Sequence, residues 1–301
     1  MSSPANESEP RALCDEDELL AAVAQAAAQP SRRAFGGGAF DRLPAIYFIG
    51  DSRSITFRNV VYTSEFTNRS YLLRSAHLRS LYAGDFRSRA GPVNEALLNQ
   101  LATDQALIIH DGPMGWTAAR ADGPNGPAPL VFFCGLADMF RTLDALGPDA
   151  DIRAWDELSR RCDVSRVPAS RLVSAEETLR IALETLEPFA LGIEALRTMG
   201  FDRIFLHGCP RFTLGERFEA DNRGAKWRRQ IHPNVIAKAL LLFDEAIRSI
   251  AVRTNARYVA GPVDADGVLP PEVTHDDVHY NDEGARRVVQ SVVSVLEGVV
   301  E

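Results

Sequence analysis

Short apolar runs alternate along most of the chain with longer stretches in which apolar residues recur every three or four positions. Short runs without strict alternation are typical of strands covered on both faces, as in a parallel sheet. The longer pattern is typical of helices that bury one side. The sequence therefore predicts strands at 45–49, roughly 77–83, 106–110, 130–134, 203–207 and 257–260.

Helical patterns are clearest in the second half of the chain, and they predict helices over 178–199, 234–252 and 283–298. Asn281 is placed to cap the start of the last helix. Pro188 and Gly192 suggest a kink or break in the first one. Because strands and helices alternate, the sequence predicts a three-layer α/β/α domain, flavodoxin-like, with a parallel sheet.

One domain is expected from 45 to 301, since neither an internal repeat nor a second composition interrupts it. Residues 1–44 differ, with a polar start, an Ala-rich helical stretch at 15–29 and a linker that contains three consecutive glycines. The length of 301 residues and a hydrophobic content of 46% are enough for a substantial core.

Charge and cysteine content narrow the possible partners. The net charge of −8 disfavours a nucleic-acid partner. The four cysteines are widely spaced and form no CxxC pair, which argues against a zinc site or a disulfide framework. We see no secretion signal and no apolar stretch of membrane-spanning length. The expectation is a soluble cytoplasmic protein with no metal, no cofactor and no membrane partner; its oligomeric state is not indicated.

Two short segments far apart in the sequence carry the candidate chemistry. The first predicted strand ends in Gly50-Asp51-Ser52, which exposes a serine hydroxyl on a tight turn. Near the other end of the chain, Asp276 precedes His279 by three residues, so that one segment supplies a base and its orienting carboxylate. Serine, histidine and aspartate are the groups that acyl transfer through a covalent intermediate requires.

This order, an early Gly-Asp-Ser and a late Asp-x-x-His, resembles the SGNH (GDSL-type) hydrolase superfamily, over about 45–299. The resemblance implies that Ser52, rather than Ser54, is the nucleophile. His279 is then the general base and Asp276 its partner, whereas His275 and Asp277 lack the required spacing. It also implies an oxyanion donor from the main chain of Gly84.

One block of the family departs from its pattern here. The family has Gly-x-Asn-Asp after the third core strand, and this chain has Gly135-Leu136-Ala137-Asp138. Ala137 has no side-chain donor, and loss of one oxyanion donor typically costs about 10²–10³ in rate. Another group can fill the role, or the enzyme is slow on a reactive substrate, or hydrolysis is lost. We favour the first, with these candidates: Asn94, His110, Arg141 and His207.

The resulting expectation is hydrolysis of a carboxylic ester, such as an acetyl ester of a small molecule or glycan, through an acyl-enzyme. The alternatives are an O-acyltransferase acting on a sugar or metabolite hydroxyl, and a non-catalytic binding module of the same fold. A flavodoxin-like FMN protein is a further rival, but it leaves the Asp-x-x-His segment unexplained. We expect His207 and Cys209 to be a hydrogen-bonded loop histidine and a buried thiol. Two loops, 111–129 and 211–229, are expected near the substrate.

Overall fold

The computed structural model of the protein describes residues 11–12, 43–57, 60–77, 83–86, 128–147, 149–153, 168–212 and 231–299. The strands in these ranges are β1 (Arg11–Ala12), β2 (Ala45–Gly50), β3 (Val60–Thr63), β4 (Ser70–His77), β5 (Leu130–Phe133), β6 (Ala150–Arg153), β7 (Arg171–Ser174), β8 (Ile204–His207), β9 (Arg211–Phe212), β10 (Arg257–Val259) and β11 (Val268–Leu269). The helices are η2 (Ser52–Phe57), η3 (Ala83–Phe86), α5 (Leu136–Leu146), α7 (Ala175–Thr198), α9 (Pro233–Arg253), η5 (Pro271–Val273) and α10 (Asp282–Leu296), where η marks a 3₁₀ helix.

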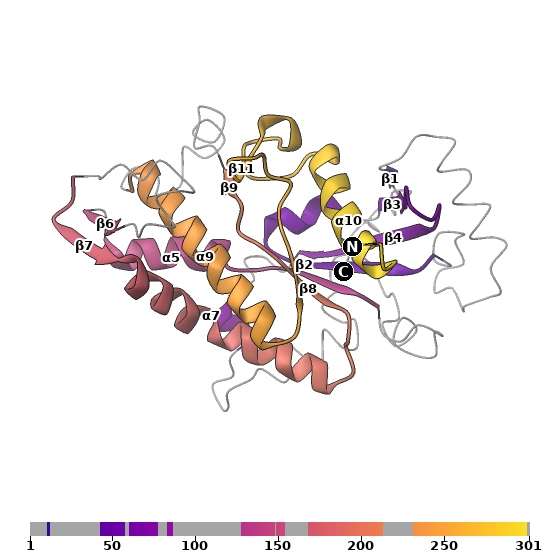
Figure 1. Ribbon diagram of the computed structural model, residues 1–301, viewed down its shortest axis with the longest axis horizontal. Helices are drawn as coiled ribbons and strands as arrows, with labels where there is room; N and C mark the ends of the chain where they lie inside the picture. The colour runs from indigo at the N-terminus through magenta and orange to yellow at the C-terminus, as the bar shows by residue number, and fades with distance from the viewer. Residues whose placement is uncertain are drawn as a thin grey trace, which may run out of the picture.

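The central sheet contains seven strands in the order β1-β3-β4-β2-β5-β8-β10 (Figure 1). β4, β2, β5, β8 and β10 run parallel to one another. Numbered along the chain, these strands lie in the order 2-1-3-4-5, which is that of the flavodoxin-like doubly wound sheet. The predicted fold class is therefore confirmed. β3 adds an antiparallel strand beside β4, and β1 pairs in parallel with β3.

Helices cover both faces of the sheet. In the view of Figure 1, α7 lies below the strands and α10 lies above them. Four consecutive residues of β2, from Ile46 to Ile49, are at most 3% exposed, so this strand is buried on both faces. That explains its unbroken apolar sequence. In the part of the chain described, no helix is both long and apolar enough to cross a bilayer.

Four of the six predicted strands are confirmed as β2, β5, β8 and β10. The prediction at 77–83 falls mostly on 78–82, outside the described residues, and the second parallel strand that the structure shows, β4, ends at His77 and was not predicted. β4 contains Arg74 and Ser75, which are buried at 8% and 2% exposure and interrupt its apolar pattern. The predicted strand at 106–110 and helix at 15–29 lie outside the described residues, and the domain boundary at 45 stays a prediction.

The predicted helices are confirmed as α7, α9 and α10. Of the kink or break predicted in α7, the break is wrong. α7 runs without interruption from Ala175 to Thr198 with Pro188 inside it. Gly192 is needed for packing instead, because a Cβ atom there would lie 2.3 Å from Cδ1 of Phe86. The Asn281 cap of α10 is also confirmed, since its side-chain oxygen accepts a hydrogen bond from Gly284 N at 3.0 Å.

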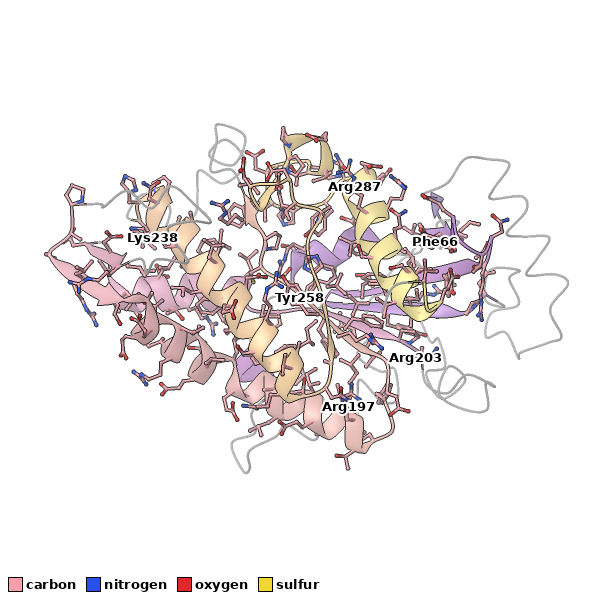
Figure 2. The ribbon with its side chains drawn as sticks, in the orientation of Figure 1. Phe66, Arg197, Arg203, Lys238, Tyr258 and Arg287 are labelled. Atoms are coloured by element: carbon pink, nitrogen blue, oxygen red, sulfur yellow. The ribbon has the colours of Figure 1, made fainter. Side chains whose placement is uncertain are left out.

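A buried ion pair joins α9 to the two-stranded β6–β7 sheet. Lys238 Nζ donates to Asp151 Oδ1 at 2.7 Å, and the same oxygen accepts from Ile152 N at 2.8 Å. Both charged side chains are 2% exposed. Figure 2 labels Lys238 toward the end of α9 that lies near β6 and β7, far from α10.

Candidate active site

The turn that carries Ser52 depends on a glycine. Gly50 ends β2 with φ +147°, and a Cβ atom there would lie 2.0 Å from the carbonyl oxygen of Phe133 on β5. No larger residue fits so close a backbone approach. The chain then turns into η2, whose first residue is Ser52, at the carboxyl ends of β2 and β5. Ligand sites of doubly wound sheets lie at this edge.

Ser52, His279 and Asp276 form one hydrogen-bonded chain. Ser52 Oγ lies 2.7 Å from His279 Nε2, and His279 Nδ1 lies 2.6 Å from Asp276 Oδ2. A carboxylate only accepts, so Nδ1 carries a proton, and in the neutral ring Nε2 accepts from the serine hydroxyl. The structure thus brings together three residues that the sequence predicted as partners across 227 positions.

Asp276 also shapes the segment that carries it. Its Oδ1 accepts from the main-chain N–H of Val278 at 3.1 Å and of His279 at 2.7 Å. Burial alone would raise the pKa of Asp276, but the hydrogen bonds from His279 and Val278 outweigh it and hold that pKa below its ordinary value. The carboxylate therefore stays ionised beside the imidazole.

Backbone pairing within the segment 274–280 gives His275 and Asp277 different surroundings from those of Asp276 and His279. Thr274 and Tyr280 form an antiparallel bridge, and His275 N donates to His279 O at 2.9 Å. His275 is exposed to solvent. Asp277 is 5% exposed and adopts a left-handed backbone with φ +68°. The carboxylate that contacts the His279 ring is that of Asp276, in agreement with the three-residue spacing.

Ser54, the alternative serine, is buried and directed inward. It is 0% exposed, and its hydroxyl donates to Asp51 O at 2.9 Å. Ser52 is half-buried and lies against His279 instead. The geometry therefore favours Ser52 as the accessible hydroxyl.

The segment that carries Gly84 is held from two sides. Asp138, in the first turn of α5, accepts from Ala83 N at 3.0 Å through Oδ2 and at 3.3 Å through Oδ1. On the other side, Phe86 is fully buried and fits against Gly192 of α7. The sequence grouped Asp138 with the oxyanion block but did not predict that it anchors η3. The only sequence signal for such a role was the position of Asp138 as an acidic residue in the first turn of α5.

The block with the missing donor begins α5. Gly135 precedes the helix with φ +96°, a conformation that favours glycine, and Ala137 is half-buried in the first turn. Of the compensating candidates, Arg141 is exposed on α5. Asn94 and His110 lie outside the described residues, as do most of 111–129 and most of 211–229.

His207 does not supply the missing donor. Its Nδ1 lies 2.7 Å from Gly208 O and its Nε2 lies 3.1 Å from Tyr280 Oη, so both ring nitrogens have partners away from Ser52. Burial, with the nearby Arg53 charge, lowers the pKa of His207 to about 3. Burial likewise raises the pKa of Cys209 to about 12. His207 is hydrogen-bonded as expected, although it ends strand β8 and does not lie in a loop, and Cys209 is the buried thiol that we expected.

The residues on either side of Ser52, Asp51 and Arg53, form a buried ion pair that the sequence did not predict. Arg53 Nη2 lies 2.7 Å from Asp51 Oδ2, Arg53 Nε lies 2.9 Å from Asp51 Oδ1, and Arg53 is 2% exposed. Burial by itself would lower the pKa of Arg53, but Asp51 keeps it above its ordinary value.

Among the described residues, no group of three or more His, Cys, Asp or Glu side chains is arranged to hold a metal ion.

No protein-family model matches the chain, and no curated protein matches it significantly. Among solved structures, it is similar to a GDSL-like lipase from Bacteroides thetaiotaomicron, with a TM-score of 0.43, 15% identity and coverage of 94% of this chain and 98% of that one. It is also similar to a variant of an acetyl xylan esterase from Geobacillus stearothermophilus, with a TM-score of 0.31, 12% identity and coverage of 84% and 93%. Because both TM-scores are below 0.5, the functional inference rests on the geometry of this chain.

Proposed function

We propose that the protein hydrolyses carboxylic esters through an acyl-enzyme on Ser52. The observation that carries this proposal is the continuous hydrogen-bonded chain from Ser52 Oγ through His279 to Asp276, with separations of 2.7 and 2.6 Å. A nucleophile within reach of a base, and a base oriented by a third group, is the arrangement that activates a serine hydroxyl.

The proton movements follow from this arrangement. Ser52 Oγ attacks the ester carbonyl carbon while His279 Nε2 takes the hydroxyl proton, and Asp276 stabilises the imidazolium that forms. His279 then returns the proton to the leaving alcohol, which departs and leaves the acyl group on Ser52. A water molecule attacks the acyl carbon, again giving its proton to His279, and the acid leaves as Ser52 regains its hydrogen.

Main-chain donors stabilise the negative charge that develops on the carbonyl oxygen. The N–H groups of Ser52 and Gly84 are the proposed donors, since both lie in short 3₁₀ turns at the carboxyl edge of the sheet. The anchoring of Ala83 by Asp138 supports this role, because it fixes the residue next to Gly84. With Ala137 in place of an amide side chain, Asn94 and His110 remain candidates for a third donor.

Labelling with a fluorophosphonate probe tests the proposal directly. The probe reacts with an activated serine, so the wild type and Ser54→Ala should be labelled and Ser52→Ala should not. Equal labelling of Ser52→Ala would refute the assignment. A folded wild type that reacts with neither the probe nor a p-nitrophenyl acyl ester would instead favour a binding module.

The acyl-enzyme also permits transfer to an alcohol in place of water. We propose hydrolysis as the main reaction on a small-molecule or glycan ester in the cytoplasm. Adding a sugar or primary alcohol to the assay distinguishes the two reactions. A hydrolase releases mainly the free acid, whereas an O-acyltransferase converts the acyl group to the new ester.

A further inference from the structure

The two halves of the proposed triad come from segments with no sequence proximity, so something must fix their separation. Ser52 begins η2, and His279 lies in the segment 274–280. Thr56, also in η2, donates its hydroxyl to the carbonyl oxygen of Tyr280 at 2.9 Å. This bond ties the residue after His279 to the helix that starts with Ser52.

The side chain of Tyr280 is held by a second contact. Tyr280 and His207 are both 0% exposed, and their Oη and Nε2 atoms are 3.1 Å apart. Because Gly208 O only accepts, His207 Nδ1 must be the protonated nitrogen, and Nε2 of the neutral ring accepts from the tyrosine hydroxyl. The imidazole ring of His207 also stacks on the ring of Phe133, with centroids 4.4 Å apart.

The same carbonyl connects this pair back to η2. Gly208 O accepts from Arg53 Nη1 at 3.2 Å as well as from His207 Nδ1 at 2.7 Å. Arg53 is oriented by its contacts with Asp51, the residue directly before Ser52. Gly208 also has no room for a side chain, since a Cβ atom would lie 2.3 Å from both Asp244 Oδ1 and Tyr258 Oη.

We infer that Arg53, His207 and Tyr280 are positioning residues, forming a buried relay from Ser52's own helix through Gly208 O to the residue beside His279. The relay runs Arg53–Gly208 O–His207–Tyr280, and it sets the distance and angle between Ser52 Oγ and the His279 ring. The inference rests on the proposed function, but it assigns this role to groups that do not touch the substrate.

Tyr280→Phe is the variant that tests the relay, because it removes one hydroxyl and keeps the buried ring. Misplacing a catalytic group by about 1 Å can cost about 10²-fold in rate, so we expect kcat to fall about 10- to 100-fold while KM stays near the wild-type value. The matched control is Tyr71→Phe, which removes another buried, hydrogen-bonded hydroxyl, 2.9 Å from Glu297. Tyr71→Phe should retain wild-type kcat.

Thr56→Val is a second test variant in case Tyr280→Phe does not fold, because valine has nearly the same shape as threonine. It removes the bond to Tyr280 O, and we expect the same direction of change in kcat. Wild-type kcat in the folded variants, or an equal loss in Tyr71→Phe, would overturn the positioning role.

Nitrogen-15 NMR of the histidine rings tests the relay without any turnover. His207 should show the Nδ1–H tautomer and should not titrate between about pH 5 and 8. The ring signals of His279 should move in Tyr280→Phe and stay in place in Tyr71→Phe. The other His207 tautomer, or unmoved His279 signals, would overturn the relay. A wild type inert toward esters and probe, with these NMR results intact, would refute the proposed function while supporting the link.

Discussion

Two buried ion pairs with the same shortest separation lie in different regions of this protein. Arg53–Asp51 and Lys238–Asp151 both have a shortest N–O separation of 2.7 Å, and all four side chains are at most 9% exposed. The first joins neighbours in sequence beneath Ser52, and the second joins α9 to β6 across 87 positions. The first continues through Gly208 O toward His279, whereas the second connects a peripheral sheet to a helix. A buried ion pair can thus support either an active site or only the stability of the fold. Which of the two it supports depends on the residues that the pair contacts.

The largest effect is expected at the site itself. Ser52→Ala should lower kcat for a p-nitrophenyl ester by up to about 10⁶-fold, because triad members act as a unit. Its melting temperature should stay near that of the wild type, since only a half-buried hydroxyl is lost. Ser54→Ala is the control and should remain active; activity in Ser52→Ala with loss in Ser54→Ala would reverse the assignment.

The carboxylate that orients His279 should come next. Asp276→Asn removes the acceptor that fixes the imidazole tautomer, and a loss of about 10⁴ in kcat is expected. Asp277→Asn should retain most activity, because asparagine tolerates the left-handed backbone that Asp277 adopts. If Asp277→Asn proves the more damaging of the two in steady-state kinetics, the pairing with His279 is wrong.

The distant ion pair should respond in stability and not in rate. Lys238→Met removes the cation that lies 2.7 Å from the buried Asp151 carboxylate, and breaking a buried ion pair in this way typically costs about 3–5 kcal/mol. Urea unfolding should show this loss, while kcat per folded molecule should equal that of the wild type. Replacing both partners by apolar residues should recover much of the stability. A fall in kcat of the folded variant would remove the distinction between the two regions.

A smaller change is expected from restoring an amide at the edge of the site. Ala137→Asn should raise kcat if no other side chain supplies a third oxyanion donor, by at most the 10²–10³ or so that one such donor contributes. Asn94→Ala is the complementary variant. Should it lower kcat while Ala137→Asn has no effect, Asn94 already provides that donor.

The smallest effect is the acid dependence of stability. Because hydrogen bonds hold the pKa of Asp276 below its ordinary 3.8, its contribution to folding is complete above that value. It is lost as the pH falls through the lower pKa of the folded state. The stability difference between the wild type and Asp276→Asn, measured by urea unfolding, should therefore shrink as the pH falls below about 4. A difference that stays unchanged between about pH 4 and pH 3 would show that ionisation of this carboxylate does not contribute to stability.

What the sequence predicted well is local or strongly periodic. The buried strands, the amphipathic helices and the Asp276–His279 spacing are each readable within one segment, and a family resemblance paired that segment with Ser52. β4 was missed because its buried Arg74 and Ser75 look polar in sequence. The relay could not be foreseen, because Tyr280 and His207 are 73 positions apart and neither belongs to a motif.

Gly192 has a consequence for how the protein can vary. The position has no chemical group and lies on α7, yet a single methyl group there would press into the ring of Phe86. Phe86 ends the four-residue turn that contains Gly84, so the added volume would be transmitted to the proposed oxyanion donor. A larger residue at 192 is thus expected to alter activity by displacing Phe86, although it changes none of the reacting groups.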